Sequence, residues 1–186
     1  QDQSFFKRKD VLSFLESHVT QSLDKFYDYF IAAKIFVYCE ENEFEKAKEM
    51  LQNEKIVTLM KNAMVFAESQ LYGSKQQSRS KLIKKTIVLT TLEKRNRKFF
   101  DFLISRDFDV TNLGESIHFW NNDPVKQKMH FWYLLTKYLF QAGEVGIALL
   151  KRLSSLPQVK KGPCLVGCLF IAVTIKNNSS NIAQPD

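Results

Sequence analysis

Apolar residues recur at three- and four-residue intervals along most of the chain, and this is the spacing of one face of an α-helix. The strongest segment spans residues 22–41, where only Lys34 interrupts an apolar stripe. Aromatic side chains dominate the stripe, so we expect this face to pack against another helix. The stripe consists of Leu23, Phe26, Tyr27, Phe30, Ile31, Val37 and Tyr38.

Six further segments have the same helical spacing. Asp10 precedes the first of them as an N-cap residue. Asp123 and Pro124 mark the start of a later one, because aspartate caps helices and proline is favoured in the first turn. Gly73 ends the segment that begins near Ile56. The predicted segments are 11–19, 44–51, 56–71, 99–104, 124–140 and 145–153.

Residues 81–92 fit two structures. The run from Thr86 to Thr91 favours a strand by residue preference, whereas the leucines at 82, 89 and 92 share one face of a helix. No partner strand is evident elsewhere, so we predict a helix. Lys81, Lys84 and Lys85 would then lie on one face, because offsets of three and four align on a helix.

Two stretches repeat one organisation: a long helix, a residue that tolerates positive φ, a glutamate, and a helix with an alanine on its contact face. Residues 38–47 reverse at Asn42, and residues 139–148 reverse at Gly143. Ala47 and Ala148 would let the paired helices approach closely. Each stretch is therefore predicted to be a helical hairpin.

The predicted fold is all-α, an irregular α-solenoid of antiparallel helical hairpins. The small numbers of Gly (6) and Pro (4) agree with this, because an all-β chain needs more tight turns. We divide the chain into N-terminal helical hairpins at 1–72, a basic loop and helix at 73–98, C-terminal helical hairpins at 99–156, and an uncertain apolar segment with a mobile tail at 157–186. The apolar run at 164–175 is too short to span a bilayer.

Both hairpins resemble those of tetratricopeptide repeats, in which a Gly-Asp/Glu turn precedes an alanine on the second helix. Residues 26–51 (FYDYFIAAKIFVYCEENEFEKAKEML), with residues 5–15 before them (FFKRKDVLSFL), resemble the helical region of vertebrate testis- and ovary-specific PAZ-domain proteins. That resemblance implies a cytosolic germ-cell protein that acts in spermatogenesis and male meiosis, on RNA or through RNA-associated partners. The turn at 41–47 is also similar to one in the helical dimerisation domain of telomere repeat-binding factors.

Positive charge is concentrated in one segment. The whole chain carries a formal net charge of +7, but residues 73–98 hold nine basic residues and one acidic residue, which leaves the remainder close to neutral. Such a segment attracts RNA, DNA or an acidic protein, although it is also typical of a solvated surface. The candidate contacts are Lys81, Lys84, Lys85, Arg95, Arg97 and Lys98.

The sequence contains no recognisable catalytic or metal-binding arrangement. None of the three histidines lies four residues from another histidine or a cysteine, and no Gly-rich phosphate loop is present. The acidic run at 40–45 fits a solvated hairpin tip. We therefore expect no enzyme activity, no cofactor, no metal and no small-molecule substrate. Three cysteines without a disulfide framework (Cys39, Cys164 and Cys168) predict buried thiols in a soluble cytoplasmic protein, not a membrane protein.

The predicted function is a non-enzymatic interaction scaffold that binds a protein partner in a groove near Trp120, Trp132 and Tyr133. The alternatives are RNA binding through the basic segment 75–98 and a telomere-factor-like dimerisation domain. If the basic set and the aromatic set border one groove, nucleic acid is the better partner. If the two sets lie apart, a protein partner is favoured.

Overall fold

Helices form most of the structure, a computed structural model that describes residues 24–72, 82–116, 123–160 and 162–164. A small antiparallel sheet and one turn of 3-10 helix, η1, complete the regular elements of this part of the chain. In chain order they are α2 (Asp24–Glu40), α3 (Phe44–Met50), α4 (Glu54–Asn62), β1 (Val65–Glu68), η1 (Gln70–Tyr72), β2 (Leu82–Lys85), α5 (Ile87–Glu93), α6 (Arg97–Ser105), β3 (Gly114–Ser116), α7 (Pro124–Gln141) and α8 (Gly143–Ser155).

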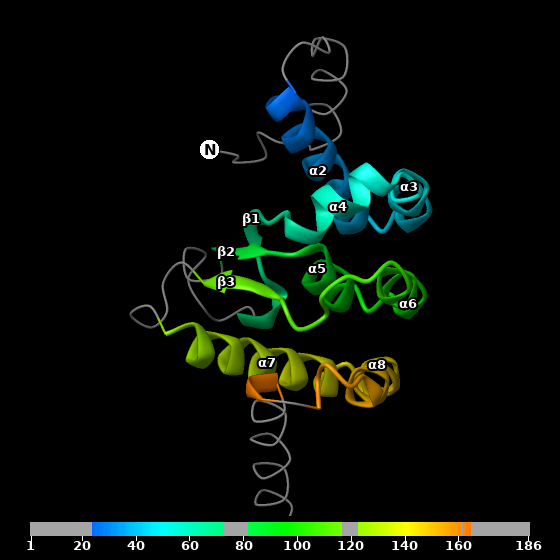
Figure 1. The fold of residues 1–186 in the computed structure, drawn as a ribbon. Coiled ribbons are helices and arrows are strands. Elements are labelled where there is room, and N and C mark those ends of the chain that lie inside the picture. Colours follow the sequence, from blue (N-terminus) through cyan, green and yellow to red (C-terminus); the bar gives the residue numbers. More distant parts are fainter. Residues whose placement is uncertain (1–23, 73–81, 117–122, 161, 165–186) are drawn as a thin grey trace, which may run out of the picture.

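Three helix pairs lie one above another in Figure 1: α2 with α3, α5 with α6, and α7 with α8. The sheet lies beside α5 in the middle layer, in the strand order β1-β2-β3. The fold is thus mostly helical, but the prediction of an all-α fold is wrong, because the sheet takes one strand from each of the first three predicted regions.

Each helix pair reverses at a residue with positive φ. Asn42 (φ 62°) lies between α2 and α3, Arg95 (φ 57°) lies between α5 and α6, and Gly143 (φ 68°) is the first residue of α8. The reversals predicted at Asn42 and Gly143 are confirmed. The reversal at Arg95 has no signal in the sequence, because arginine does not favour the left-handed region.

The face of α2 that contacts the core differs from the predicted stripe. Ile31 is buried as expected, but Ile35 and Cys39 are fully buried, while Val37 and Tyr38 are only partly so. The contact face is therefore rotated by about one residue around the helix, or roughly 100°. The observed face places Glu40, at the end of α2, against Lys85 of the sheet.

The helix predicted at 56–71 is correct only in its first half. α4 ends at Asn62, and the extended backbone of Ala63 leads into β1. Val65 and Ala67 alternate with two exposed residues, so the same apolar positions satisfy the two-residue period of a strand. The helical and strand patterns coincide here, and pairing with β2 decides between them.

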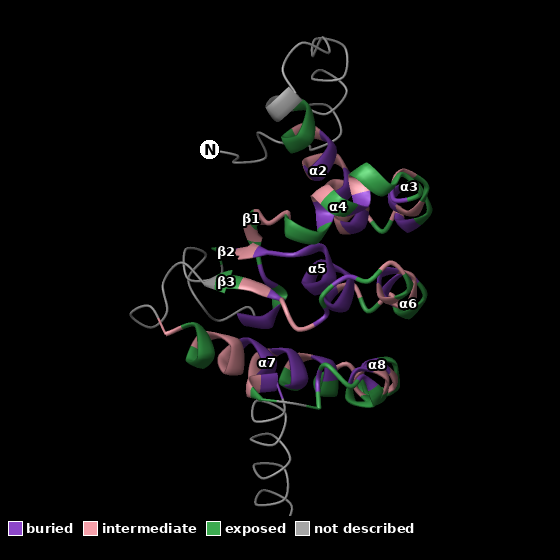
Figure 2. Ribbon diagram, in the orientation of Figure 1, coloured by how far each residue is buried: buried purple, intermediate pink, exposed green. Residues whose placement is uncertain are grey.

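The segment at 81–92 divides into two elements, so a single helix is the wrong prediction for its first part. Residues 82–85 form β2, the central strand, and Thr86 then caps α5 by accepting a hydrogen bond from the backbone N–H of Leu89 (3.3 Å). Thr90 and Thr91 donate their hydroxyls to backbone carbonyls one turn earlier (3.2 and 2.8 Å). Their polar groups are thereby satisfied, and all seven residues of α5 are buried in the middle layer (Figure 2).

Other helical predictions agree with the structure. Asp123 caps α7 as expected, and its carboxylate accepts hydrogen bonds from the backbone N–H groups of Val125 and Lys126, both 3.1 Å. Phe44 and Ala47 of α3 are buried, as are Phe99, Phe100 and Leu103 of α6. The predictions for 11–19, for the loop at the start of the segment 73–98 and for the C-terminal segment after Cys164 fall outside the described residues.

The backbones of α7 and α8 approach closely at Gly146, which is buried, whereas the predicted contact residue, Ala148, is partly buried. A Cβ atom added at Gly146 would lie 1.7 Å from the carbonyl oxygen of Leu139. Because that atom belongs to the backbone of α7, a rotamer change cannot relieve the overlap. The third pair therefore depends on glycine at this position.

We expect Gly146→Ala to lower the free energy of unfolding by about 3 kcal/mol, because the two helices must separate to admit the methyl group. Urea unfolding followed by circular dichroism measures the change. Gly143→Asn is the control: its site is open and Asn tolerates positive φ, so the loss there should stay under about 1 kcal/mol. Equal losses in both variants would contradict the proposed overlap.

Candidate functional site

Charged side chains converge in the interior around Lys85, the last residue of β2. The strand alternates, so Lys85 points inward beside Ile83 while Lys84 points outward. The side chain of Lys85 is 2% exposed, and its ammonium group donates to Glu40, to Glu93 (3.0 Å) and to the backbone carbonyl of Glu68 (3.3 Å). We call Lys85, Glu40, Glu93, Ser69 and Lys94 the Lys85 cluster.

Glu93 is the most deeply buried acid of the cluster. It ends α5, and its side chain is 1% exposed. Besides the ammonium group of Lys85, its carboxylate accepts the hydroxyl of Ser69 (2.5 Å) and the backbone N–H of Gln70 (2.9 Å). Glu93 therefore joins α5 to the chain between β1 and η1.

Two further groups tie the cluster to the outer layers. Glu40, at the end of α2, also pairs with Lys94, 3.1 Å away. From α7, the hydroxyl of Tyr138 donates to the backbone carbonyl of Glu93 (2.7 Å), and Arg95 lies 4.8 Å from the centre of the tyrosine ring. The cluster thus contacts all three layers of the fold.

Burial and charge act against each other on these groups. Burial alone would lower the pKa of Lys85, but Glu93 and Glu40 outweigh it and hold that pKa above its usual value. Burial alone would raise the pKa of Glu40, but Lys85 and Lys94 outweigh it and lower that pKa. For Glu93 burial prevails and raises the pKa, although Lys85 and Ser69 offset part of the effect.

The charged members of the Lys85 cluster are paired with one another. Ser69 lies beside a carboxylate and close to an amine, which is a combination found in some nucleophilic sites. Its hydroxyl is nevertheless buried and hydrogen-bonded to Glu93, and none of the cluster lines the described cavity. The prediction of a solvated hairpin tip at 40–45 is therefore wrong for Glu40, because this residue lies on the core-facing side of α2 and pairs with Lys85.

The basic segment does not form one exposed face. Lys84 and Lys85 are on opposite faces of β2, so the predicted alignment of Lys81, Lys84 and Lys85 on a helix is wrong. Lys85 is buried and unavailable to a phosphate group. Lys84 pairs with Glu115 (3.2 Å) on the outer face of the sheet, and Lys81 lies outside the described residues.

The remaining predicted basic residues lie at the turn between α5 and α6. Arg95, Arg97 and Lys98 are exposed there. Arg97 pairs with Asp101 (3.7 Å), and Arg95 lies over the ring of Tyr138. Much of the local positive charge therefore has an acidic or aromatic partner within the fold.

The predicted aromatic groove corresponds in part to a cavity of about 280 Å³ between the loop at 109–115 and the first turns of α7. Trp132 lines it but is 1% exposed, and its indole N–H points to the carbonyl of Thr111, 3.5 Å away. Lys128 donates to the hydroxyl of Thr111 (2.8 Å) in the same wall. Tyr133 is partly buried and does not line the cavity, and Trp120 lies outside the described residues.

Other candidate chemistry is limited in the described ranges. They contain no group of three or more His, Cys, Asp or Glu side chains placed to hold a metal ion. Cys39 and Cys164 are buried, as predicted, and burial raises the pKa of the Cys39 thiol. Burial also lowers the pKa of the half-buried His130. Within the same ranges no helix has the length and apolar character required to cross a bilayer.

Comparison of the chain with protein-family models, with curated proteins and with solved structures finds no match.

We expect Lys85→Met to destabilise the fold by about 3–5 kcal/mol, because it leaves the carboxylates of Glu93 and Glu40 without their shared partner. Lys84→Met is a matched control one residue away on the outer face, where the change should stay under about 0.5 kcal/mol. Urea unfolding of both variants measures the difference. Similar losses at the two positions would show that the buried ion pairs contribute little.

The lowered pKa of Glu40 predicts a dependence of stability on acid. Its stabilising contribution is present above the pKa of the unfolded state, about 4.3, and is lost as the pH falls through the folded-state value. We therefore expect the free energy of unfolding to fall more steeply below about pH 5 in the wild type than in Glu40→Gln. Glu93, whose pKa is raised, is present in both proteins. Parallel pH profiles of the free energy of unfolding in the two proteins would contradict a stabilising role for the Glu40 carboxylate.

Proposed function

We propose that this chain is a non-enzymatic helical scaffold that binds a protein partner. The observation that carries the proposal is the separation of the two candidate binding sets. None of the described basic residues predicted to bind RNA lines the cavity beside Trp132, and Lys84 reaches that cavity only through its ion pair with Glu115. A single basic and aromatic groove would have favoured nucleic acid.

The stacked helix pairs support a binding role of this kind. We infer that α2–α3, α5–α6 and α7–α8 form a short irregular α-solenoid with the sheet inserted beside its middle pair. Stacked hairpins bury a continuous core between neighbouring pairs and leave their outer surfaces free for partners. This geometry suits binding better than catalysis, because the ionisable residues at its centre are paired with one another.

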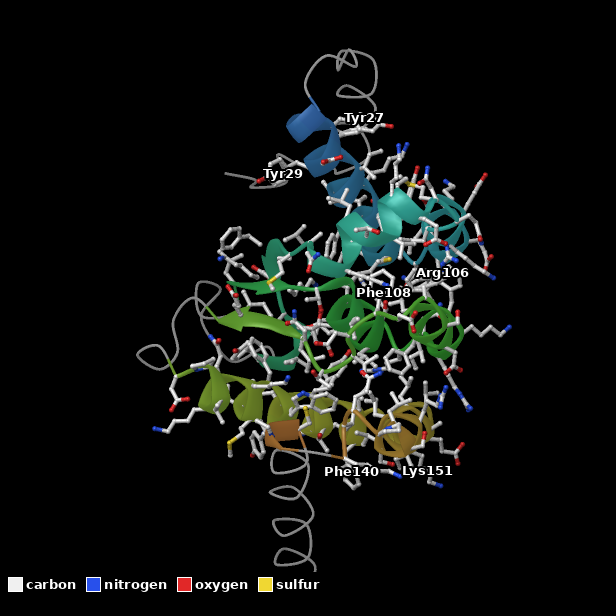
Figure 3. The ribbon with its side chains drawn as sticks, viewed as in Figure 1. Tyr27, Tyr29, Arg106, Phe108, Phe140 and Lys151 are labelled. Atoms are coloured by element: carbon white, nitrogen blue, oxygen red, sulfur yellow. The ribbon has the colours of Figure 1, made fainter. Side chains whose placement is uncertain are left out.

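Exposed aromatic side chains supply candidate contacts. Tyr29 is 76% exposed and Phe66 is 62% exposed, the two highest values among the exposed large hydrophobic residues of the described chain. Figure 3 labels Tyr27 and Tyr29 on the first turns of α2, apart from the layers beneath. Aromatic residues of this kind often contribute most of the binding energy in protein interfaces.

The resemblance to testis- and ovary-specific PAZ-domain proteins suggests the setting, a germ-cell cytoplasm during meiosis with RNA-associated partner proteins. RNA binding by the chain itself is the second candidate, and the exposed side chains of Arg95, Arg97 and Lys98 favour it. We rank it lower, because Arg97 is paired with Asp101 and Lys85 is buried.

Immobilised chain should recover a stoichiometric protein partner from nuclease-treated germ-cell extract. We expect Tyr29→Ser/Phe66→Ser to reduce recovery about tenfold, since it removes two exposed aromatic contacts without disturbing the core. Arg97→Ser/Lys98→Ser is the control and should leave recovery unchanged. Quantitative mass spectrometry of the eluates measures both.

A filter-binding titration with single-stranded RNA tests the alternative. We expect no saturable binding at low salt. Tight binding that weakens steeply with salt and is lost in Arg97→Ser/Lys98→Ser would contradict the protein-partner proposal and establish RNA binding instead. Concentration-dependent dimers in sedimentation velocity, with no other partner recovered, would favour the dimerisation alternative.

A further inference from the structure

β1 is an edge strand of the sheet. It pairs with β2 on one side, and no other strand of the described chain pairs with Val65–Glu68 on the other side. In an edge strand, alternate residues direct their N–H and C=O groups away from the sheet. These groups are a template for the main chain of another strand.

The sequence of β1 lacks two of the usual features that prevent such pairing, although the strand is short and carries one charged residue, Glu68. Proteins commonly protect an edge with lysine, proline or a bulge, and the residues VFAE contain neither of those side chains. The register with β2 is continuous over all four residues, so there is no bulge. The edge is therefore short and regular, and one of its carbonyls, that of Glu68, already accepts a hydrogen bond from Lys85.

The outer face of the sheet already carries a row of interacting side chains that ends at this edge. Phe66, Lys84 and Glu115 are cross-strand neighbours. The ammonium group of Lys84 lies 5.6 Å from the ring centre of Phe66 and 3.2 Å from the carboxylate of Glu115. Phe66 ends the row, and 62% of its surface is exposed. An apolar side chain on an added strand would extend the row.

Glu68 defines the charge of the edge. It lies two residues from Phe66 on the same face, it is exposed, and no ion pair to its carboxylate is present in the described structure. Its cross-strand neighbour on β2 is Leu82, which brings no opposite charge. A basic residue on an added strand would complement this carboxylate.

We propose that the free edge of β1 binds an extended peptide of a partner protein, with an apolar residue opposite Phe66 and a basic residue opposite Glu68. The inference rests on the proposed function and specifies the partner at one surface. A second copy of the chain fits less well, because the strand VFAE would bring another carboxylate and no cation to the edge.

Fluorescence anisotropy with the whole chain tests the proposal. The probe is a fluorescein-labelled peptide of about eight residues in which threonine alternates with lysine and valine, so that lysine and valine are two positions apart. We expect saturable binding with a Kd of about 100 μM. Methylation of alternate backbone nitrogens should abolish it, because the side chains remain but the ladder hydrogen bonds are lost.

A charge exchange provides the specific test. Glu68→Lys should weaken binding of the lysine peptide about fivefold. It should strengthen binding of a peptide with glutamate in place of lysine by a similar factor. Phe66→Ser should weaken binding of both peptides. Val145→Ser, which changes an exposed apolar residue on α8, should leave both affinities unchanged. Because these variants alter exposed side chains, circular dichroism should show unchanged folding.

Three results would overturn the inference: no binding of the lysine peptide at millimolar concentration, equal binding of the methylated peptide, or a dimer of the chain that Phe66→Ser abolishes. The first two, together with successful recovery of a partner by the immobilised chain, would leave the scaffold proposal intact and locate the partner on another surface. The third would assign the edge to a second copy.

Discussion

The buried ammonium group of Lys85 is the interaction on which the arrangement of the layers depends. A lysine at 2% exposure is unfavourable unless its charge is compensated, and here two carboxylates from different helices compensate it. Glu40 comes from the end of α2 and Glu93 from the end of α5, so the charge requirement places both helix ends against the central strand. Hydrophobic packing alone does not select such a precise arrangement, because apolar contacts are non-directional.

Other polar contacts connect neighbouring layers at their edges. Arg106, which follows α6, donates to the carbonyls of Leu51 (2.9 Å) and Gln52 (3.3 Å) after α3 and pairs with Glu54 (2.9 Å) at the start of α4 (Figure 3). Arg152 of α8 pairs with Asp101 of α6 at 2.7 Å. The first contact connects the upper and middle layers of Figure 1, and the second connects the middle and lower layers.

The sequence predicted the parts of the fold that depend on local signals. Asn42, Gly143 and Asp123 have turn or cap preferences that act without the rest of the chain, and these elements are confirmed. The sheet is not evident from the sequence for two linked reasons. The segment of β2 has no recognisable partner strand, and the apolar positions in the segment of its actual partner, β1, also fit a helix. The Lys85 cluster could not be predicted, because the two carboxylates that pair with Lys85 lie 8 and 45 residues from it along the chain and meet it only after the sheet forms.

The order of residues in β2 leaves its alignment open to a one-position shift. The strand reads Leu-Ile-Lys-Lys, so such a shift would still place an aliphatic residue and a lysine on the inner face. The choice is made just beyond the strand: Thr86 must cap α5, and Gly114 lies opposite Lys85, where an added Cβ would be 2.1 Å from the carbonyl oxygen of Lys84. Thr86 and Gly114 therefore favour the observed alignment, in which Lys85 and not Lys84 is the lysine that the two carboxylates surround.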